Sequence, residues 1–582
     1  MIVVHVTHEA VEKIGGIGAV IAGLMNARAY AKNVSRTVLL GPLLQTDRPV
    51  TQRLGEGGQV IYSSLDAITP SPWLEKFHPI EKTYDVGIIY GTRKVIDPCS
   101  MQSVDSEVLL VDVFHSNRDR LNLFKGELFK KFAVPSHDFE KVWEYEQYVR
   151  LAEPGFEALK AIGCNGGQQL VLLSHEYMGM PIALKAILAG SPNTKTVFYA
   201  HEVASVRPIV EKMAGHDTMF YNVMEQASGK QALEEVFPSV HANFKHPLVK
   251  AARYCDHVFA VGDLIVDELR FVDPRFRNQE IDLVYNGIPS HRISLKEKLD
   301  SRRKMKDYSR ILFGREPSWV FSHVCRPVLS KAIWRDLRVL HEMEPMLLAA
   351  GETAVYYMLG TLGGQRRPQD VRHMERLYGW PAAHEVGYPD LCGGEEVLGE
   401  TFDYFNRDHA SVRAVLVNQW DWNPKYCGER MPADMTFADI RHGTDLEFGL
   451  SVYEPFGISQ FEPLSFGALC VVSNVCGCTG FARRAMGKKP FKNIVEGNFL
   501  HLPRPAGAEE LLTMGIPQRD QIESAEGQRL ARLVMDRLPR DEKTMSALMD
   551  SGHDLAQRMS WENVMQEYFL PALARVAPPN GK

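Results

Sequence analysis

Short runs of apolar residues alternate with amphipathic, helix-like segments along most of the chain. The apolar runs lie at 2–6, 38–40, 86–90, 108–113, 170–173, 197–199, 258–261 and 283–285, and then at 320–324, 354–359, 412–417, 446–450 and 470–473. Buried strands that alternate with helices are typical of a mostly parallel sheet with helices on both faces. The pattern therefore predicts an α/β protein with mostly parallel sheets.

A turn-forming break separates the two series of strands. Asn286, Gly287 and Pro289 lie close together there, and the charged stretch 295–304 follows them. At 582 residues the chain is too long for a single hydrophobic core, so two domains are expected. We place the domain boundary after residue 290.

Charge and cysteine content exclude several classes of function. A formal net charge of −6 argues against a general nucleic-acid binder, which would carry a basic excess. The 9 cysteines are scattered and odd in number, which is typical of reduced thiols, and Cys476 and Cys478 have no second Cys/His pair for zinc. The chain begins with an apolar strand and has no apolar run near the length of a membrane span. We expect a soluble, cytoplasmic protein that binds neither nucleic acid nor membrane.

Two carboxylates flank the start of a predicted helix in the stretch 451–462. Pro455 and Gly457 suit a turn, and a helix is predicted to begin at Ile458. The unpaired N–H groups and positive dipole end of a helix start favour a diphosphate. Glu454 and Glu462 cannot bind phosphate, but they can accept hydrogen bonds from sugar and ribose hydroxyls. The segment therefore indicates a nucleotide-sugar site; the alternative is a pair of solvated glutamates beside an amphipathic helix.

Three predicted strands end in a His-Glu pair. The pairs are His8-Glu9, His175-Glu176 and His201-Glu202. Ligands of open parallel sheets bind beyond the carboxyl ends of the strands, so these side chains are expected to line one cleft. Their donors and acceptors suit several sugar hydroxyls, whereas one such pair alone is usually a cap or a surface pair.

Two cations and a glycine-rich turn complete the candidate chemistry. Arg326 and Lys331 follow the predicted strand 320–324 at a helix start, where cations oppose the helix dipole unless an anion lies between them. They are therefore predicted to grip phosphate, Arg326 with a planar fork and Lys331 with a point charge; the alternative is a pair of solvated cations. Gly15 and Gly16 follow the first strand and permit a ligand to approach the backbone closely; the alternative is an ordinary turn.

The spacing of Glu454 and Glu462, with the sequence Phe466-Gly-Ala-Leu-Cys-Val-Val-Ser after it, resembles the C-terminal signature of retaining glycosyltransferases with two Rossmann-like domains. The resemblance is closest to bacterial and plant glycogen and starch synthases. Further matches occur in the family's order at Lys13-Ile-Gly15-Gly16-Ile, Asn286-Gly287-Ile288, Arg326-Pro-Val-Leu-Ser-Lys331 and Met559-Ser-Trp561-Glu. The resemblance covers nearly the whole chain and is looser at 60–140 and 362–436.

The resemblance implies the GT-B fold, in which two Rossmann-like domains with mostly parallel sheets face a central cleft. Residues 1–290 would form the acceptor-side domain, 291–555 the nucleotide-sugar domain, and 556–582 a helix that crosses back to the first domain. The family's catalytic positions correspond to Glu454, His201, Arg326 and Lys331. Its donor-binding positions correspond to Lys13, Gly15, Gly16, Gly457, Ile458, Ser459 and Glu462, the last on the ribose, and its acceptor-side positions to Glu9, His175, Glu176 and Asn286.

Some features of the chain limit what the resemblance implies. The sequence has no Asp-X-Asp tripeptide, the usual metal grip of the other nucleotide-sugar transferase architecture. Charge neutralisation would then rest on Arg326, Lys331 and helix dipoles, and we expect no metal and no cofactor besides the nucleotide-sugar substrate. Pro289 stands where the family has Asp, the loop 475–480 replaces its Thr-Gly-Gly, and the segment from Tyr177 lacks its histidines. These departures leave the acceptor open.

Three interpretations follow. The first is transfer of glucose from ADP-glucose or UDP-glucose to the non-reducing end of an α-1,4-glucan. The second is a related retaining transferase that makes a small disaccharide or glucoside, and the third is a non-catalytic glucan-binding or regulatory protein. The third is disfavoured because the chain keeps six of the family's functional residues, namely Lys13, His201, Arg326, Lys331, Glu454 and Glu462. The expected partners are a nucleotide-sugar and a glucan or oligosaccharide; homo-oligomerisation stays open.

An aromatic-rich segment lies within the loosely matching part of the chain. It contains Trp380, Trp420 and Trp422. The segment could form a carbohydrate platform. The favoured alternative is an ordinary insertion.

Overall fold

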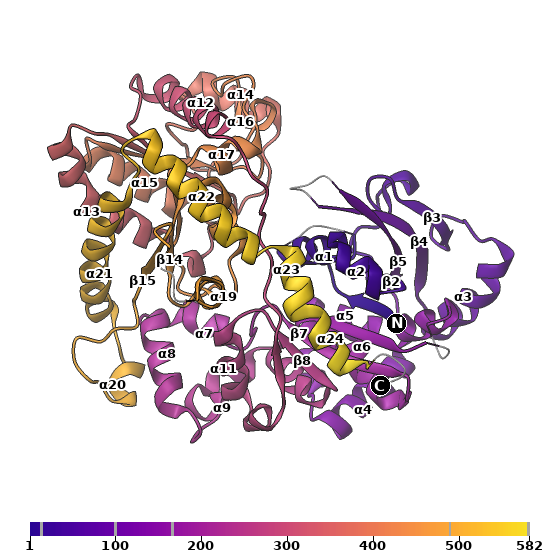
Figure 1. The fold of residues 1–582 in the computed structure, drawn as a ribbon. Helices are drawn as coiled ribbons and strands as arrows, with labels where there is room; N and C mark the ends of the chain where they lie inside the picture. Colours follow the sequence, from indigo (N-terminus) through magenta and orange to yellow (C-terminus); the bar gives the residue numbers. More distant parts are fainter. Residues whose placement is uncertain (12–14, 98–101, 165–167, 488–490, 579–582) are drawn as a thin grey trace. The chain divides into compact units, whose positions relative to one another are not determined.

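The computed structural model describes residues 1–11, 15–97, 102–164, 168–487 and 491–578 (Figure 1). The chain divides into two compact units. The first unit comprises Met1–Ile209, Ala227–Gly287 and Trp561–Lys582, and the second comprises Val210–Gln226 and Ile288–Ser560. Each unit is built around its own sheet. Within the described ranges, every helix is too short or too polar to span a lipid bilayer.

The first unit contains a nine-stranded sheet in the order β3-β4-β5-β2-β1-β6-β7-β8-β9. Its strands are β1 (Ile2–Val6), β2 (Arg36–Pro42), β3 (Gln59–Ser63), β4 (Gly87–Ile96), β5 (Ser103–Asp112), β6 (Leu170–His175), β7 (Thr194–Ala200), β8 (His257–Ala260) and β9 (Ile281–Leu283). All pairings are parallel except β3–β4 and β4–β5. Because β1, β6 and β7 are neighbours with the same direction, their carboxyl ends lie at one edge of the sheet.

Helices cover the strands of the first unit. They are α1 (Ile17–Asn26), α2 (Arg28–Asn33), α3 (Ser71–Tyr84), α4 (Arg118–Phe132), α5 (Trp143–Ala161), α6 (Glu176–Ala189), α9 (Leu233–Val236), α10 (His246–Ala251), α11 (Asp263–Val272), α23 (Trp561–Val564) and α24 (Leu570–Val576). Every residue of β1 and β6 is buried. Burial on both faces explains why these strands are continuous apolar runs rather than alternating ones.

The second unit contains a six-stranded, fully parallel sheet in the order β12-β11-β10-β13-β14-β15. Its strands are β10 (Trp319–Val324), β11 (Ala354–Leu359), β12 (Val412–Val417), β13 (Leu446–Gly449), β14 (Leu469–Ser473) and β15 (Ile494–Gly497). Its helices are α8 (His216–Ala227), most of which belongs to this unit, α12 (Leu295–Phe313), α13 (Ile333–Ala350), α14 (Pro368–Leu377), α15 (Glu396–Asp408), α16 (Pro424–Cys427), α17 (Phe437–Gly443), α18 (Ile458–Phe461), α19 (Gly477–Met486), α20 (Ala508–Leu512), α21 (Ile516–Arg537) and α22 (Glu542–Arg558). The short helix α7 (Arg207–Lys212) spans the division between the units.

Successive residues of these strands point into two separate cores. Tyr356 of β11 packs with Leu340 of α13 in one cluster, and Tyr357 packs with Met305 of α12 in the other. The side-chain period of two along a strand produces this division. The prediction of an α/β fold with mostly parallel sheets is confirmed, although the antiparallel pairing of β3 with β4 and of β4 with β5, and the short strand β15, were not foreseen.

The tryptophans of the 362–436 region belong mainly to the core. Trp380 and Trp422 are fully buried and lie in the same apolar cluster, and Nε1 of Trp380 donates to Oδ1 of Asn418 over 2.9 Å. Trp420 is 61% exposed. Most of the aromatic area is therefore packed into a core shared with β11 and α12, as expected for an ordinary insertion rather than a carbohydrate platform.

One buried arginine ties three helices of the second unit together. The guanidinium of Arg335 on α13 lies 2.6 Å from a carboxylate oxygen of Asp217 and 2.8 Å from one of Glu523, and all three side chains are inaccessible to solvent. Asp217 lies on α8 and Glu523 on α21. Loss of one partner would leave the other charges buried and uncompensated.

Replacing Arg335 by Ala should lower the free energy of unfolding by about 3–5 kcal/mol. The control is Arg310→Ala, which removes an exposed arginine paired with Asp307 at 2.7 Å and should cost less than about 1 kcal/mol. Urea unfolding followed by tryptophan fluorescence would measure both changes. Equal losses in the two variants would show that the buried cluster contributes no more than a surface pair.

Candidate functional site

The turn between β13 and α18 carries the first motif glutamate. α18 begins at Ile458, as predicted, and the 3-10 turn η7 (Glu462–Phe466) follows it directly. Gly457 precedes the helix with φ of 90°, and a Cβ there would lie 2.5 Å from Oε1 of Gln460 and 2.9 Å from Cγ of Glu454. Only glycine fits this position without strain. The path of the backbone before Ile458 therefore depends on this one residue.

An ion pair joins Glu454 to Lys331. Lys331 is the last residue of the 3-10 turn η6 (Leu329–Lys331), and the two side chains are 18% and 11% exposed. Nε2 of Gln460 lies 3.5 Å from the same carboxylate, and the N–H of Val452 donates to the carbonyl of Ser330 over 2.8 Å. The structure thus brings together two predicted site residues that are 123 positions apart in the chain.

A buried arginine on α17 holds the second motif glutamate. Arg441 lies 3.0 Å from a carboxylate oxygen of Glu462 and 3.2 Å from one of Glu447, and it also donates to the carbonyl of Ser459. The side chain of Arg441 is 5% exposed and that of Glu462 is 25% exposed. Glu447 in turn accepts the backbone N–H of Val324 over 2.9 Å. A single guanidinium therefore connects the end of β10, strand β13 and the predicted ribose-binding glutamate.

Arg326 differs from Lys331 because its side chain is exposed. It follows the end of β10 at Val324. Within the ranges that the structure describes, its guanidinium forms no hydrogen bond or ion pair. It is therefore open to an anion without the loss of an existing contact.

Three imidazoles form a buried hydrogen-bonded chain in the first unit. Nδ1 of His5 lies 2.9 Å from Nε2 of His175, and Nδ1 of His175 lies 2.7 Å from Nε2 of His201. His5 lies within β1, His175 ends β6, and His201 follows β7, so the order of the strands sets the order of the rings. At the far end, Nε2 of His5 lies 3.2 Å from the hydroxyl of Tyr30, which lies 2.9 Å from Oγ1 of Thr37.

Burial favours the neutral form of all three rings. It lowers the pKa of His5 to about 3 and the pKa of His201 to about 3. Burial also lowers the pKa of His175 well below its usual value, and the neighbouring rings of His201 and His5 add to this shift. At neutral pH each ring therefore has one donor and one acceptor nitrogen.

The carboxylate of Glu9 anchors the glycine-rich turn. The N–H of Gly18 donates to Oε2 of Glu9 over 2.9 Å, and a Cβ on Gly15 would lie 3.1 Å from Oε1 of the same residue. Gly16 caps the start of α1, and a Cβ there would meet nothing within 4 Å. The sequence prediction for Lys13 falls outside the described residues. Glu9 thus supports the turn, and His8 approaches it with Nε2 at 3.7 Å from Oε1.

The other predicted acceptor-side residues are buried. Glu176 accepts the backbone N–H of Glu202 over 2.5 Å, and its backbone has φ of 57°. Burial and the charge of Glu202 raise the pKa of Glu176 well above its usual value. Asn286 is 5% exposed, and within the described residues its Oδ1 has no hydrogen-bond partner. Glu176 therefore already uses one oxygen to fix the loop after β7.

The residues that the sequence interpretation missed are polar positions inside apolar elements. His5 interrupts the first buried strand, and Glu447 interrupts β13. A polar group in a buried strand needs a partner, so a polar residue within an apolar run is the sequence signal that could have identified them. Arg441 lies in a short helix and has no comparable signal.

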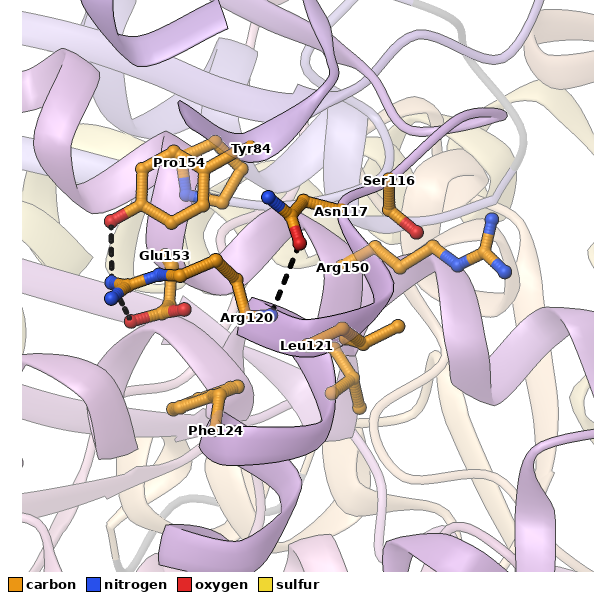
Figure 2. A pocket seen from close by; sticks show the side chains of 10 residues that line it. Tyr84, Ser116, Asn117, Arg120, Leu121, Phe124, Arg150, Glu153 and Pro154 are labelled. Atoms are coloured by element: carbon orange, nitrogen blue, oxygen red, sulfur yellow. Dashed lines mark hydrogen bonds and ion pairs between the residues drawn. The ribbon is translucent and has the colours of Figure 1, made fainter. Parts of the chain in front are cut away.

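A separate small pocket lies in the first unit, between α4 and α5 (Figure 2). Arg120 lies 3.3 Å from both the hydroxyl of Tyr84 and a carboxylate oxygen of Glu153. Arg150 lies 3.3 Å from a carboxylate oxygen of Glu146. Both cations of this pocket are already paired, and none of the predicted site residues lines it. Within the described residues, no group of three or more His, Cys, Asp or Glu side chains could hold a metal ion.

The chain is similar to known proteins in structure, at low sequence identity. No protein-family model matches the sequence, and no curated protein matches it. The catalytic domain of starch synthase IV from Arabidopsis thaliana, bound to ADP and acarbose, aligns with a TM-score of 0.52 at 13% identity, over 99% of this chain and 98% of that chain. A UDP-forming α,α-trehalose-phosphate synthase from Burkholderia xenovorans, in complex with glucose-6-phosphate, aligns with a TM-score of 0.51 at 11% identity, over 98% and 99%. The chain therefore has the GT-B fold of retaining glycosyltransferases, as the resemblance in the sequence implied.

Proposed function

We propose that the protein is a retaining hexosyltransferase that moves glucose from ADP-glucose or UDP-glucose to the non-reducing end of an α-1,4-glucan. The observation that carries this proposal is the ion pair of Lys331 with Glu454 within a GT-B fold, because it joins the two motifs assigned to the donor. A starch synthase is among the structures with the same fold, and its ligands are ADP and acarbose.

The leaving diphosphate defines what the site must do. Negative charge grows on the diphosphate as the bond to the sugar breaks, so donors and cations must be placed there in advance. Arg326 offers an exposed planar fork, and Lys331 offers a point charge held in place by Glu454. The turn from Gly457 to Ser459 would add backbone N–H groups.

Glu454 and Glu462 would have separate tasks. Glu454 orients Lys331 and lies beside the transferred glucose, while Glu462 accepts ribose hydroxyls with the oxygen that Arg441 does not hold. In the front-face route that the family resemblance implies, the bond from the anomeric carbon to the phosphate oxygen breaks. The acceptor oxygen forms its bond on the same face, and its proton passes to the departing phosphate.

A second candidate is transfer to a small acceptor, which would yield a disaccharide or glucoside. It is favoured by the likeness to a trehalose-phosphate synthase, whose TM-score of 0.51 equals that of the starch synthase within 0.01. Incubation with radiolabelled ADP-glucose or UDP-glucose and with glycogen, maltose or monosaccharides, followed by product sizing, distinguishes the two. Label in chains that lengthen glycogen supports the glucan, label confined to small products supports the second candidate, and no transfer to any acceptor contradicts both.

Removal of either cation should slow the reaction strongly. Arg326→Ala and Lys331→Ala are each expected to lower kcat by roughly two to three orders of magnitude, the usual cost of losing a preorganised group beside developing negative charge. The control is Arg376→Ala, which removes a 72% exposed arginine on α14. Initial rates on both donors would measure the effect; near wild-type rates for either cation variant would refute its assignment to the diphosphate.

Activity should survive excess EDTA, because the proposed charge neutralisation uses Arg326, Lys331 and backbone groups. The assay compares initial rates of protein treated with EDTA and of protein supplemented with magnesium or manganese. Complete loss of activity that either ion restores would contradict a metal-independent site.

The two motif glutamates should differ in kinetic signature. Glu454→Gln keeps the shape but removes the charge that holds Lys331, so it should lower kcat. Glu462→Gln should act mainly on the KM of the donor, since contacts with the ribose are alike in ground and transition states. Rates measured against donor concentration test this order, and equal losses of kcat, or a larger loss in Glu462→Gln, would reverse the assignment.

A further inference from the structure

His201 ends a chain of hydrogen bonds that links five side chains. They run from Thr37 through Tyr30, His5 and His175 to His201, with separations of 2.9, 3.2, 2.9 and 2.7 Å. His5 and His175 are fully buried and Tyr30 is 3% exposed, whereas His201 is only partly buried. The middle of the chain is therefore buried, and its two ends, Thr37 and His201, are partly exposed.

The direction of the protons along this chain is coupled from end to end. A neutral imidazole donates with one nitrogen and accepts with the other, so the tautomer of one ring dictates that of the next. Both bonds between rings join an Nδ1 to an Nε2. Either all three rings are protonated on Nδ1, or all three are protonated on Nε2.

Donor and acceptor strengths favour the first of these arrangements. In it, the Thr37 hydroxyl donates to Tyr30 and the phenol of Tyr30 donates to Nε2 of His5, and the one proton without an acceptor in the chain is on Nδ1 of His201. In the reverse direction Nε2–H of His5 would donate to the phenol oxygen, and the proton without an acceptor in the chain would be that of Thr37. A neutral imidazole nitrogen is a stronger acceptor than a phenol oxygen, and a phenol is a stronger donor than an imidazole N–H, so the first direction is favoured.

We propose that Thr37, Tyr30, His5 and His175 are positioning residues that fix His201 as a neutral ring with its Nδ1–H directed away from the chain. This ring nitrogen is then a hydrogen-bond donor for an oxygen of the bound ligand, and it cannot act as an acceptor. If the proposed function is correct, that oxygen belongs to the sugar or the phosphate near the reacting centre.

Burial and ring packing support this arrangement. His201 packs against Tyr199 with ring centroids 4.4 Å apart, and His175 stacks on His201 with centroids 5.0 Å apart. Outside the chain, His8 acts on both His175 and His201, and its charge would lower the pKa of both rings further. A neutral donor of this kind keeps its state while the charge of the ligand changes.

The tautomers can be read directly by ¹⁵N NMR of protein labelled in the histidine rings, with assignments from His5→Asn, His175→Asn and His201→Asn. At pH 7.5 we expect all three rings to be protonated on Nδ1 alone. A ring protonated on Nε2, or on both nitrogens, would overturn the proposal. This measurement uses ligand-free protein, so its result does not depend on whether the protein proves to be a hexosyltransferase.

A kinetic test separates positioning from a purely structural role. Tyr30→Phe removes only the hydroxyl that bonds to His5 and should lower kcat about fivefold, the usual worth of one neutral hydrogen bond, with little change in the KM of the donor. The control is Tyr62→Phe, which removes the hydroxyl of another fully buried tyrosine of the first unit, bonded to Glu81, and should leave kcat unchanged.

The identity of the donor at His175 gives a second comparison. His175→Asn keeps an N–H close to the position of Nδ1, whereas His175→Leu does not, so the Asn variant should retain more turnover. Equal turnover in Tyr30→Phe and Tyr62→Phe, or equal turnover in the Asn and Leu variants, would contradict a positioning role for the hydrogen-bonded chain. Absence of transfer in the wild type on every donor would instead contradict the proposed function. The NMR measurement would then still test the tautomers of the three rings.

Discussion

Two partly buried ion pairs hold the turn that carries both motif glutamates, and the proposed site depends on them. Lys331 fixes Glu454 at one end of the 454–462 segment, and Arg441 fixes Glu462 at the other. Charges with little exposure are stable only when they are paired, because an uncompensated partner bears the full desolvation cost. The segment between them is further constrained by the positive φ of Gly457. A diphosphate at this turn would compete with Glu454 for Lys331 and would meet Arg326 without such competition.

The first unit also pairs polar side chains that have little exposure, but it does so with neutral groups. On β1 and β6 and directly after β7 it places three imidazoles that form one hydrogen-bonded chain, and burial favours their neutral form. The same parallel register that makes these strands pair also aligns the rings, since β6 lies between β1 and β7. One unit therefore carries paired charges, and the other carries neutral hydrogen-bonding groups.

The fold was predictable because it is a periodic property of the sequence. Continuous apolar runs between amphipathic segments identified the parallel strands, and the turn chemistry before Ile458 identified the start of α18. The antiparallel edge of the first sheet escaped prediction because β3 is short and partly exposed, so it lacks a strong apolar signal. Trp380 and Trp422 belong to the core for a reason that composition does not reveal, namely their packing against α12 and β11.

The candidate site was predictable only in part. Residues in recognisable motifs, such as Lys331 and Glu454, were named in advance, although their direct pairing was not. Arg441 pairs with Glu462, and His5 pairs with His175 over 170 positions; such contacts follow from tertiary structure and leave no local pattern. Glu9 and Glu176 each accept a backbone N–H, from Gly18 in α1 and from Glu202 after β7, and their place on the acceptor side stays a prediction.

Calorimetric titration of ADP and UDP into the purified protein would show whether the second unit holds the nucleoside diphosphate of a sugar donor through Arg326 and Lys331. Binding is measured in this way without any assumption about the acceptor. We expect saturable binding of one nucleotide per chain for at least one of the two, weakened more than about tenfold in Arg326→Ala. Absence of binding by both nucleotides, or equal affinity in the wild type and Arg326→Ala, would show that these cations do not hold the diphosphate.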